Sequence, residues 1–218
     1  MSITDRRARD KEEFRQKILD TARDLFVVYG YDGVTLRKIA DAIEYAPGTI
    51  YGYFKDKEEL IRALCIADWE AFEQSFPRDH HPGDPLAEIR GIGAAYLRFA
   101  LAHPNQYRLM FMTPKPPELH HLDDATLAKC GDPARDGYAL LRQTAQAAID
   151  AGLLRDELRD PDLVTQTLWA GVHGMASLEI TLGRDSWYQW LPAKARIDAI
   201  LDTLIFGIVR EGGRKAQA

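Results

Sequence analysis

Apolar residues in the first part of the chain recur every three or four positions, which is the spacing of an amphipathic helix. This pattern predicts a first helix that ends at Gly30, because the following segment, YDG, is typical of a turn. Its apolar stripe consists of Phe14, Ile18, Ala22, Leu25, Phe26 and Tyr29. A second, short helix is expected over residues 36–43, with Thr35 as its N-cap.

The next segment, APGTIYGYF, predicts a third helix that is shorter still. Pro47 suits its first position, because a backbone N–H there would have no partner within the helix. Ile50 and Phe54 are four positions apart, so both can point inward and leave the other side exposed. Asp56 opens a fourth helix, with Glu59 three positions later in the spacing of a capping box.

Two short helices braced by a longer one match the helix-turn-helix arrangement, although periodicity alone also suits a structural helical hairpin. The remaining sequence shows helical spacing as well, and no stretch alternates apolar and polar residues as a strand would. The predicted fold is therefore all-α, with a three-helix N-terminal head over residues 1–55 and a larger helical-bundle body over 56–218. Later helices are expected over residues 86–103, 105–112, 134–154, 161–182 and 192–209, with a proline-rich loop at 113–124.

Composition is that of an ordinary globular protein, with 46% hydrophobic and 28% charged residues. No apolar run reaches the roughly 20 residues that span a bilayer, and the N-terminus lacks the apolar segment of a secretion signal. Cys65 and Cys130 are far apart without a CxxC partner, which is typical of a reducing compartment, so a cytoplasmic location is expected.

The charge distribution limits the possible partners. A net charge of −5 argues against a general nucleic-acid coat, yet residues 1–57 carry eleven Lys and Arg against ten Asp and Glu. A nearly neutral head on an acidic body is compatible with a local DNA-contacting surface, and equally with solvated helix faces.

Motifs for catalysis or metal binding are weak. Glu118 and His121 form one E-x-x-H, the half-motif of a di-iron bundle, without a second copy. The pairs His80-His81 and His120-His121 fit solvated loops better than a metal site. No phosphate loop, GxSxG or Cys/His nucleophile pattern occurs. We therefore expect no enzyme, no cofactor and no metal.

Residues 35–61, TLRKIADAIEYAPGTIYGYFKDKEELI, resemble the DNA-binding signature of the TetR family of bacterial repressors. In that family a Thr-started helix, an IA pair and a turn precede GTIY, an aromatic pair, a lysine and a leucine. The matching positions here are Thr35, Ile39-Ala40, Gly48-Thr49-Ile50-Tyr51, Tyr53-Phe54, Lys57 and Leu60. The resemblance implies a homodimeric DNA-binding regulator, with residues 1–55 as its DNA-binding domain.

The resemblance also implies a role for each matching position. Contacts to phosphates would come from Thr35, Thr49, Tyr53 and Lys57. The base edges of the major groove would face Arg37, Ala46, Pro47, Gly48 and Tyr51. Because Ala46, Pro47 and Gly48 offer no side-chain hydrogen bonds, direct readout is expected to depend on Arg37 and Tyr51, with a component from DNA shape.

Two positions depart from the family pattern. Glu44 stands where the family usually has Gly, which implies strain of about 1 kcal/mol if that residue needs a positive φ. Ala46 stands where the family commonly has a capping Ser, so the cap of the third helix would be lost, and one phosphate contact with it. The alternative prediction, a helical ligand-binding or scaffold dimer without DNA binding, rests on these two departures.

A second resemblance lies in LWAGVHGMASLEI, residues 168–180, which is similar to the Trp…His-Gly segment of one group of TetR-like C-terminal domains, the WHG type. It implies that residues 56–218 bind a ligand and form a homodimer through the last two helices, about 161–182 and 192–210. Gly171 and Gly174 would permit close approach there. Burial of the final helix within one monomer is the alternative.

Aromatic residues of the body would supply a pocket for a small apolar or aromatic effector. The candidates are Trp69, Phe72, Phe99, Tyr107, Phe111, Tyr138, Trp169 and His173. Each of them also fits a core position, and His173 fits a satisfied interface histidine. The predicted function is a repressor that leaves a palindromic operator when the effector binds and shifts the fourth helix.

Overall fold

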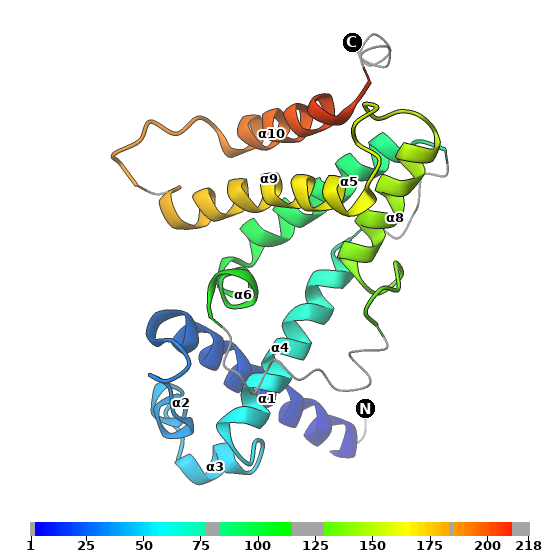
Figure 1. The fold of residues 1–218 in the computed structure, drawn as a ribbon. Coiled ribbons are helices and arrows are strands. Elements are labelled where there is room, and N and C mark those ends of the chain that lie inside the picture. The colour runs from blue at the N-terminus through cyan, green and yellow to red at the C-terminus, as the bar shows by residue number, and fades with distance from the viewer. Residues whose placement is uncertain (1–2, 77–82, 115–128, 184, 211–218) are drawn as a thin grey trace. The chain divides into compact units, whose positions relative to one another are not determined.

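The computed structural model shows a helical protein (Figure 1). Residues 3–76, 83–114, 129–183 and 185–210 are described here. Within those ranges every named element is a helix, and one isolated bridge pairs Leu154 with Val209. The prediction of an all-α fold is confirmed.

Contacts divide the described residues into two units. The first unit takes residues from Met1–Ala71 and Pro104–Leu122, and the second takes residues from Phe72–His103 and Asp123–Ala218. The first unit is larger than the predicted head, because it includes most of the fourth helix and a segment from the middle of the chain.

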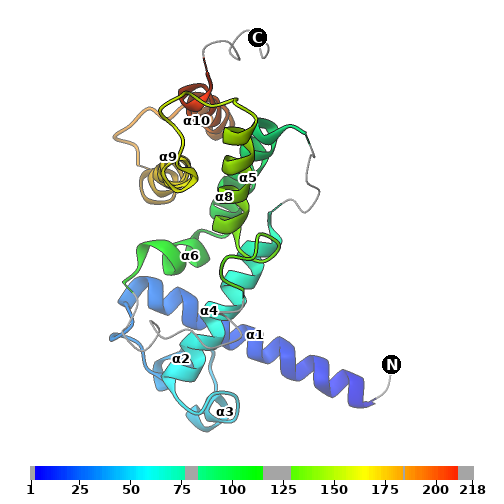
Figure 2. The same cartoon turned by 45° about the vertical axis from the view of Figure 1, so that its right-hand side comes forward.

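Six helical segments belong wholly or mainly to the first unit. They are α1 (Ile3–Tyr29), α2 (Leu36–Ala42), α3 (Pro47–Tyr51), α4 (Lys57–Gln74), α6 (Pro104–Tyr107) and the π-helix η1 (Arg108–Met112). Both views place α2 and α3 side by side next to α1 (Figures 1 and 2). The predicted single helix over 105–112 is wrong in one respect, because its second half has π geometry.

Local signals fix the ends of the short helices. Gly30 follows α1 with a φ of 68°, a left-handed conformation that glycine adopts without strain. Thr35 is the N-cap of α2, where its Oγ1 accepts the backbone N–H of Lys38 at 3.1 Å. Asp56 Oδ1 accepts the N–H of Glu59 at 2.7 Å, whereas the Glu59 carboxylate accepts the N–H of Lys55. The predicted capping box is therefore present with one difference. The Glu59 carboxylate accepts the N–H of Lys55 and not that of the cap residue Asp56.

Glu44 lies in the turn between α2 and α3 with a φ of 63°. Its neighbour Tyr45 donates its N–H to the carbonyl of Ala40 at 3.0 Å, the long-range bond of a Schellman helix end. A left-handed residue is required at this position of the motif. The strain predicted for Glu44 is thus present.

Replacing Glu44 with Gly is expected to raise the free energy of unfolding by about 0.5–1 kcal/mol, since glycine relieves left-handed strain but adds freedom to the unfolded chain. Glu44→Ala is the matched control, because it removes the carboxylate and keeps the strain. Urea unfolding of the three proteins measures the difference. Equal gains for Gly and Ala would assign the effect to charge and contradict the backbone explanation.

The core of the first unit joins its helices through fully buried apolar side chains. Ile18 and Phe26 from α1, Ile39 from α2, and Ile50 and Phe54 around α3 all lie in one cluster. The predicted inward direction of Ile50 and Phe54 is confirmed. Tyr29 was expected in the apolar stripe of α1 but is exposed, and the Lys38 ammonium lies 3.1 Å from its ring centroid.

The second unit contains α5 (Pro85–Ala102), α8 (Gly137–Asp150), α9 (Pro161–Leu182) and α10 (Ala193–Ile208). Aspartates cap three of them: Asp84 caps α5, Asp136 caps α8 and Asp160 caps α9. The bounds predicted for α9 are confirmed. The helix predicted over 134–154 is shorter at both ends, because Asp136 caps it late and Gly152 follows it with a φ of 66°.

Two glycines of α9, Gly171 and Gly174, were expected to allow close approach between copies. A Cβ at Gly171 would lie 2.6 Å from a methyl carbon of Leu204, so this glycine allows α10 to pack on α9 within one chain. A Cβ at Gly174 would meet no atom within 4 Å. The two glycines therefore differ, and Gly174 is exposed.

Several predicted features lie outside the described residues. These include most of the proline-rich loop, both histidine pairs and Glu118. Of the cysteines, Cys65 is half-buried and Cys130 is exposed. None of the described helices combines the length and apolar character needed to cross a membrane.

Candidate nucleic-acid interface

The outer side of α3 carries the residues predicted to face base edges. Ile50 is fully buried on the inner side, whereas Tyr51 is 57% exposed. Gly48 is exposed, and Pro47 and Thr49 are half-buried. The helix is only five residues long, so its position depends on the buried side chains at Ile50 and Phe54. The result is a short helix with one side packed in the core and the other side exposed to solvent.

Ala46 precedes α3 as its N-cap and makes no side-chain capping bond. Its carbonyl accepts the N–H of Thr49 at 2.9 Å, so the backbone still closes the first turn. Pro47 at the first position has no N–H that would need a cap. The predicted loss of the cap is confirmed, and helix α3 forms without it.

Thr35 and Arg37 lie at the start of α2, and both are exposed. The Thr35 hydroxyl oxygen accepts the Lys38 N–H, which leaves the hydroxyl hydrogen able to donate to an external acceptor. The helix cap and a bond to a phosphate oxygen can therefore exist together. Arg37 projects from the second position of α2 with five N–H donors, suited to bidentate contact with guanine.

Tyr53 and Lys57 follow α3 and are held by aromatic contacts. The ring of Tyr53 lies 5.2 Å from that of Phe14, measured between centroids. The Lys57 ammonium donates to the Tyr31 carbonyl at 3.1 Å and lies 3.9 Å from the Tyr31 ring centroid. This position fixes the charge while leaving N–H groups of the ammonium for a phosphate.

Two further residues, Tyr45 and Lys55, share this surface and were missed. Tyr45 is exposed just before α3, with its ring 4.6 Å from that of Phe14. The Lys55 side chain is 77% exposed between Tyr53 and Lys57. Both side chains can donate to a phosphate, and the sequence places Lys55 directly after the matched Phe54 and Tyr45 two residues before Pro47.

A buried ion pair joins α1 to α4 within the first unit. Arg23 donates from Nη2 to Asp68 Oδ1 at 2.7 Å and from Nε to both carboxylate oxygens, at 3.1 and 3.0 Å. Gln106 from α6 donates to the same carboxylate at 2.9 Å. Burial would lower the pKa of Arg23, but hydrogen bonds and charge from Asp68 and Asp20 outweigh it and raise this pKa. The helices that support α2 and α3 are thus joined by charge as well as by apolar packing.

The eight residues predicted to bind an effector fall into three groups. In the first unit, Trp69 and Tyr107 both pack on Phe111, with centroid distances of 5.5 and 5.0 Å. In the second unit, Phe72 packs edge-on against Phe99 at 5.1 Å, and both rings are buried. These five side chains lie in aromatic clusters of their own unit, and Phe72 also packs edge-on against Tyr96, with ring centroids 5.6 Å apart.

The third group combines aromatic and polar atoms. Tyr138 and Trp169 are partly exposed, with ring centroids 6.2 Å apart. Trp169 Nε1 donates to the Tyr96 hydroxyl at 3.1 Å, and this hydroxyl lies 3.2 Å from His173 Nδ1. Burial lowers the pKa of His173, so its neutral form is favoured and one ring nitrogen can accept a hydrogen bond.

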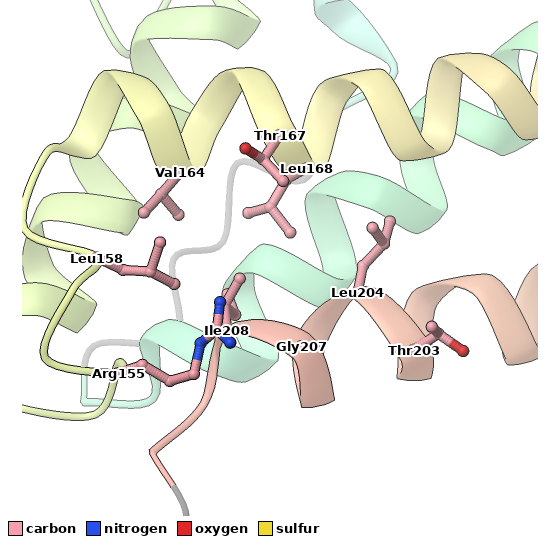
Figure 3. Close-up of a pocket in the computed structure, with 9 residues that line it drawn as sticks. All are labelled: Arg155, Leu158, Val164, Thr167, Leu168, Thr203, Leu204, Gly207 and Ile208. Carbon is pink, nitrogen blue, oxygen red and sulfur yellow. The ribbon is translucent and has the colours of Figure 1, made fainter.

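A separate pocket lies between α9 and α10, and none of the eight residues lines it. Its volume is about 150 Å³. Figure 3 shows Val164 and Leu168 pointing from α9 toward Leu204 and Ile208 on α10, with Arg155 and Leu158 at one end. We call it the end pocket, because it lies at the start of α9 and the end of α10.

Two segments of the chain match known families. Residues 18–64 match the family described as "Bacterial regulatory proteins, tetR family". Residues 89–204, more than half of the chain, match the one described as "Tetracyclin repressor-like, C-terminal domain". The first match contains α2, α3 and the start of α4, and the second runs from α5 into α10.

Curated relatives are similar mainly in the N-terminal segment. The HTH-type transcriptional repressor Rv1474c of Mycobacterium tuberculosis is 45% identical over 56 residues, 26% of this chain and 30% of that protein. The HTH-type transcriptional regulator AcrR of Shigella flexneri is 36% identical over 89 residues, 38% of this chain and 40% of that protein. The chain therefore spans well under half of the length of these relatives.

The fold extends the likeness to nearly the whole chain. A crystal structure of a TetR family transcription regulator from Marinobacter aquaeolei aligns over 94% of this chain and 100% of its own, with a TM-score of 0.67 and 18% identity. At this identity the likeness concerns the fold alone. It agrees with both family matches.

Proposed function

The chain belongs to the TetR family of bacterial regulatory proteins, which are DNA-binding transcription regulators that act as dimers, and we propose that it represses transcription by binding an operator through α2 and α3. The observation that carries this proposal is the two-sided α3. Ile50 anchors one side in the core, and Tyr51 with Thr49 forms the open side. Repression, as opposed to activation, is supported by the relative named a repressor.

Phosphate contacts would set the register of the first unit on the duplex. Thr35 retains a donor hydrogen, Lys57 is held by the Tyr31 carbonyl and ring, and Thr49 and Tyr53 carry hydroxyls beside α3. Base readout would then depend on Arg37 and Tyr51, because Ala46, Pro47 and Gly48 bring only backbone and apolar carbon groups to the groove. Tyr45 and Lys55 would add further phosphate contacts.

Replacing Arg37 with Ala is expected to flatten base preference at one or two positions of each half-site. A good bidentate arginine contact discriminates against a wrong base by about 1–3 kcal/mol, so affinity differences there should fall by roughly tenfold or more. Binding to a library of mutated operators measures the change.

The matched control is Thr49→Val, which removes a proposed phosphate contact. It should weaken binding to every library member by a similar factor and keep the base preferences. Unchanged base preferences in Arg37→Ala would contradict the assignment of Arg37. If the wild-type protein binds no member of the library, the alternative of a ligand-binding or scaffold dimer without DNA binding is favoured instead.

The dimer is proposed to form through α9 and α10, because both expose an uncharged face. Along α9 the exposed positions of this face follow helical spacing: Leu163, Thr167, Ala170, Gly174, Leu178 and Thr181. On α10 the corresponding exposed positions are Ala195, Ala199, Thr203, Phe206 and Gly207. Depletion of charge on a contiguous helical face is typical of a homodimer interface. Two first units could then reach half-sites about one helical turn apart.

An apolar or aromatic effector is proposed to bind the second unit near Tyr138, Trp169 and His173. These side chains combine partly exposed rings with polar atoms that can orient a ligand. The ligand would have to bind one of two conformations more tightly than the other to release the operator. A cytoplasmic location, which gives access to operator DNA, remains a prediction.

A further inference from the structure

The loop between α9 and α10 presents large apolar side chains to solvent. Trp187 is 85% exposed, Tyr188 is 50% exposed and Leu191 is 67% exposed. We call residues 185–191 the aromatic loop. Single exposed apolar residues are ordinary, but a tryptophan, a tyrosine and a leucine within five positions form a cluster that typically marks an interaction site.

The shape of the aromatic loop is fixed by Arg196 at the start of α10. Arg196 pairs with Glu179 of α9 at 2.5 Å and donates from Nε to the Leu191 carbonyl at 2.9 Å. Its guanidinium also lies 4.6 Å from the ring centroid of Trp190. Trp190 is therefore half-buried against Arg196, while Trp187 remains exposed. The other end of the loop is joined to α9 by a hydrogen bond from the Asp185 N–H to the Leu182 carbonyl at 2.8 Å.

The end pocket lies at the opposite end of the same two helices. Val164 and Leu168 belong to the first two turns of α9, and Leu204 and Ile208 to the last two turns of α10 (Figure 3). Arg155 brings a buried Nε to this pocket, with Glu157 3.5 Å away as an ion-pair partner and no hydrogen bond to that Nε among the described residues. A largely apolar hollow with a cationic edge suits an aromatic ring.

Two-fold symmetry would bring the aromatic loop of one copy to the end pocket of the other. Consider two antiparallel α9 helices, one from each copy, with the two-fold axis of the dimer passing at Gly174. A residue a given number of positions before Gly174 in one copy then lies next to the residue the same number of positions after Gly174 in the other. Gly174 is eight positions from Gln166, in the middle of the pocket-lining turns, and eight from Leu182, the last residue of α9. If the two α9 helices packed in parallel, the aromatic loop of one copy would lie far from the end pocket of the other, and both would stay exposed.

We propose that the aromatic loop of each copy inserts Trp187 into the end pocket of its partner, so that two such contacts close the dimer. This inference rests on the proposed dimer through α9 and α10 and specifies how its ends are joined. The pocket volume of about 150 Å³ equals that of an engineered apolar cavity that binds benzene, so one ring of the indole fits. Arg155 would lie against the ring face.

Replacing Trp187 with Ala should raise the dimer dissociation constant about 100-fold, since a buried interface tryptophan is worth at least tenfold and each dimer has two. Gly207→Leu should weaken the dimer similarly by blocking the pocket. A Cβ at Gly207 would meet no atom within 4 Å and Gly207 is exposed, so a side chain there has room to leave the backbone of the monomer. Analytical ultracentrifugation over a dilution series of full-length protein measures both constants.

Gly91→Leu is the matched control, because Gly91 is also a helical glycine whose Cβ would meet no atom within 4 Å. It lies outside the end pocket and should leave the dimer constant within about twofold of wild type. Thermal unfolding by circular dichroism in the same samples separates a weakened dimer from a misfolded chain.

Mixing the two interface variants gives the decisive result. A heterodimer of Trp187→Ala with Gly207→Leu keeps one intact tryptophan facing one open pocket, and opposes the alanine to the blocked pocket. It should therefore form about tenfold more tightly than either variant alone. If the Trp187→Ala protein has the dimer dissociation constant of wild type, or if the heterodimer is not favoured, Trp187 does not bind the end pocket. Either result is still compatible with a dimer through α9 and α10. A wild-type protein that stays monomeric at high concentration would refute both this contact and the dimer.

Discussion

Replacing Asp68 with Ala is expected to lower the free energy of unfolding by about 3–5 kcal/mol, the cost of leaving a buried charge without its partner. The side chains of Arg23 and Asp68 are almost completely buried, and their two groups share three hydrogen bonds of 2.7 to 3.1 Å. Without Asp68 the Arg23 guanidinium would keep only Asp20, and Gln106 would lose its acceptor.

Urea unfolding measures this loss, with all variants at one protein concentration because the apparent stability of a dimer depends on concentration. Two control variants remove exposed carboxylates that also bind arginine. Asp20→Ala removes the second partner of Arg23, and Asp162→Ala removes the exposed partner of Arg142. Both should lose much less stability, because exposed pairs are screened by solvent. If Asp68→Ala loses as little as these controls, the buried pair does not stabilise the first unit.

Replacing Thr49 with Asp is expected to reduce operator affinity about 100-fold or more, roughly tenfold for each of the two DNA-binding units. The change removes a hydroxyl donor from α3 and places a carboxylate where a phosphate is proposed to lie. Thr49 is the third residue of α3, a position where a negative charge stabilises a helix. Lost binding could therefore not be assigned to unfolding of α3.

Fluorescence anisotropy with a labelled operator measures the affinities, and Thr49→Ser is the matched control. Serine keeps the hydroxyl and should retain binding within about fivefold of wild type, since the phosphate contact is preserved. Equal binding by the Thr49→Asp and wild-type proteins would show that this side of α3 does not face DNA.

The N-terminal helices could be predicted well because their signals are local. Thr35, Pro47 and Asp56 each mark a helix start through a bond to a residue within three positions or, for Pro47, through a missing donor. Glu44 was identified as a strained position from a family pattern that has Gly there, and its φ of 63° agrees. Such signals need no knowledge of tertiary contacts.

Other features depend on partners distant in sequence and could not be predicted. Arg23 and Asp68 are 45 positions apart, and neither has a neighbour in sequence that indicates the pairing. The eight aromatic and histidine residues were grouped into one effector site, but their contacts divide them between the two units. Trp69 and Tyr107 pack on Phe111 in the first unit, whereas Phe72 is linked through Tyr96 to Trp169 and His173 in the second. Gly171 and Gly174 looked equivalent in sequence, but only the contact with Leu204 shows that Gly171 packs within the chain.

The central claim, that α2 and α3 bind duplex DNA, is tested most directly by the affinity of the purified protein for the DNA flanking its own gene across a series of salt concentrations. The claim predicts tight binding at low salt that weakens linearly on a logarithmic plot, with a shallower slope when Lys57 is replaced by Met. The claim would be contradicted if the wild-type protein does not bind this DNA even at low salt, or if its affinity is no higher than that of the Thr49→Asp protein.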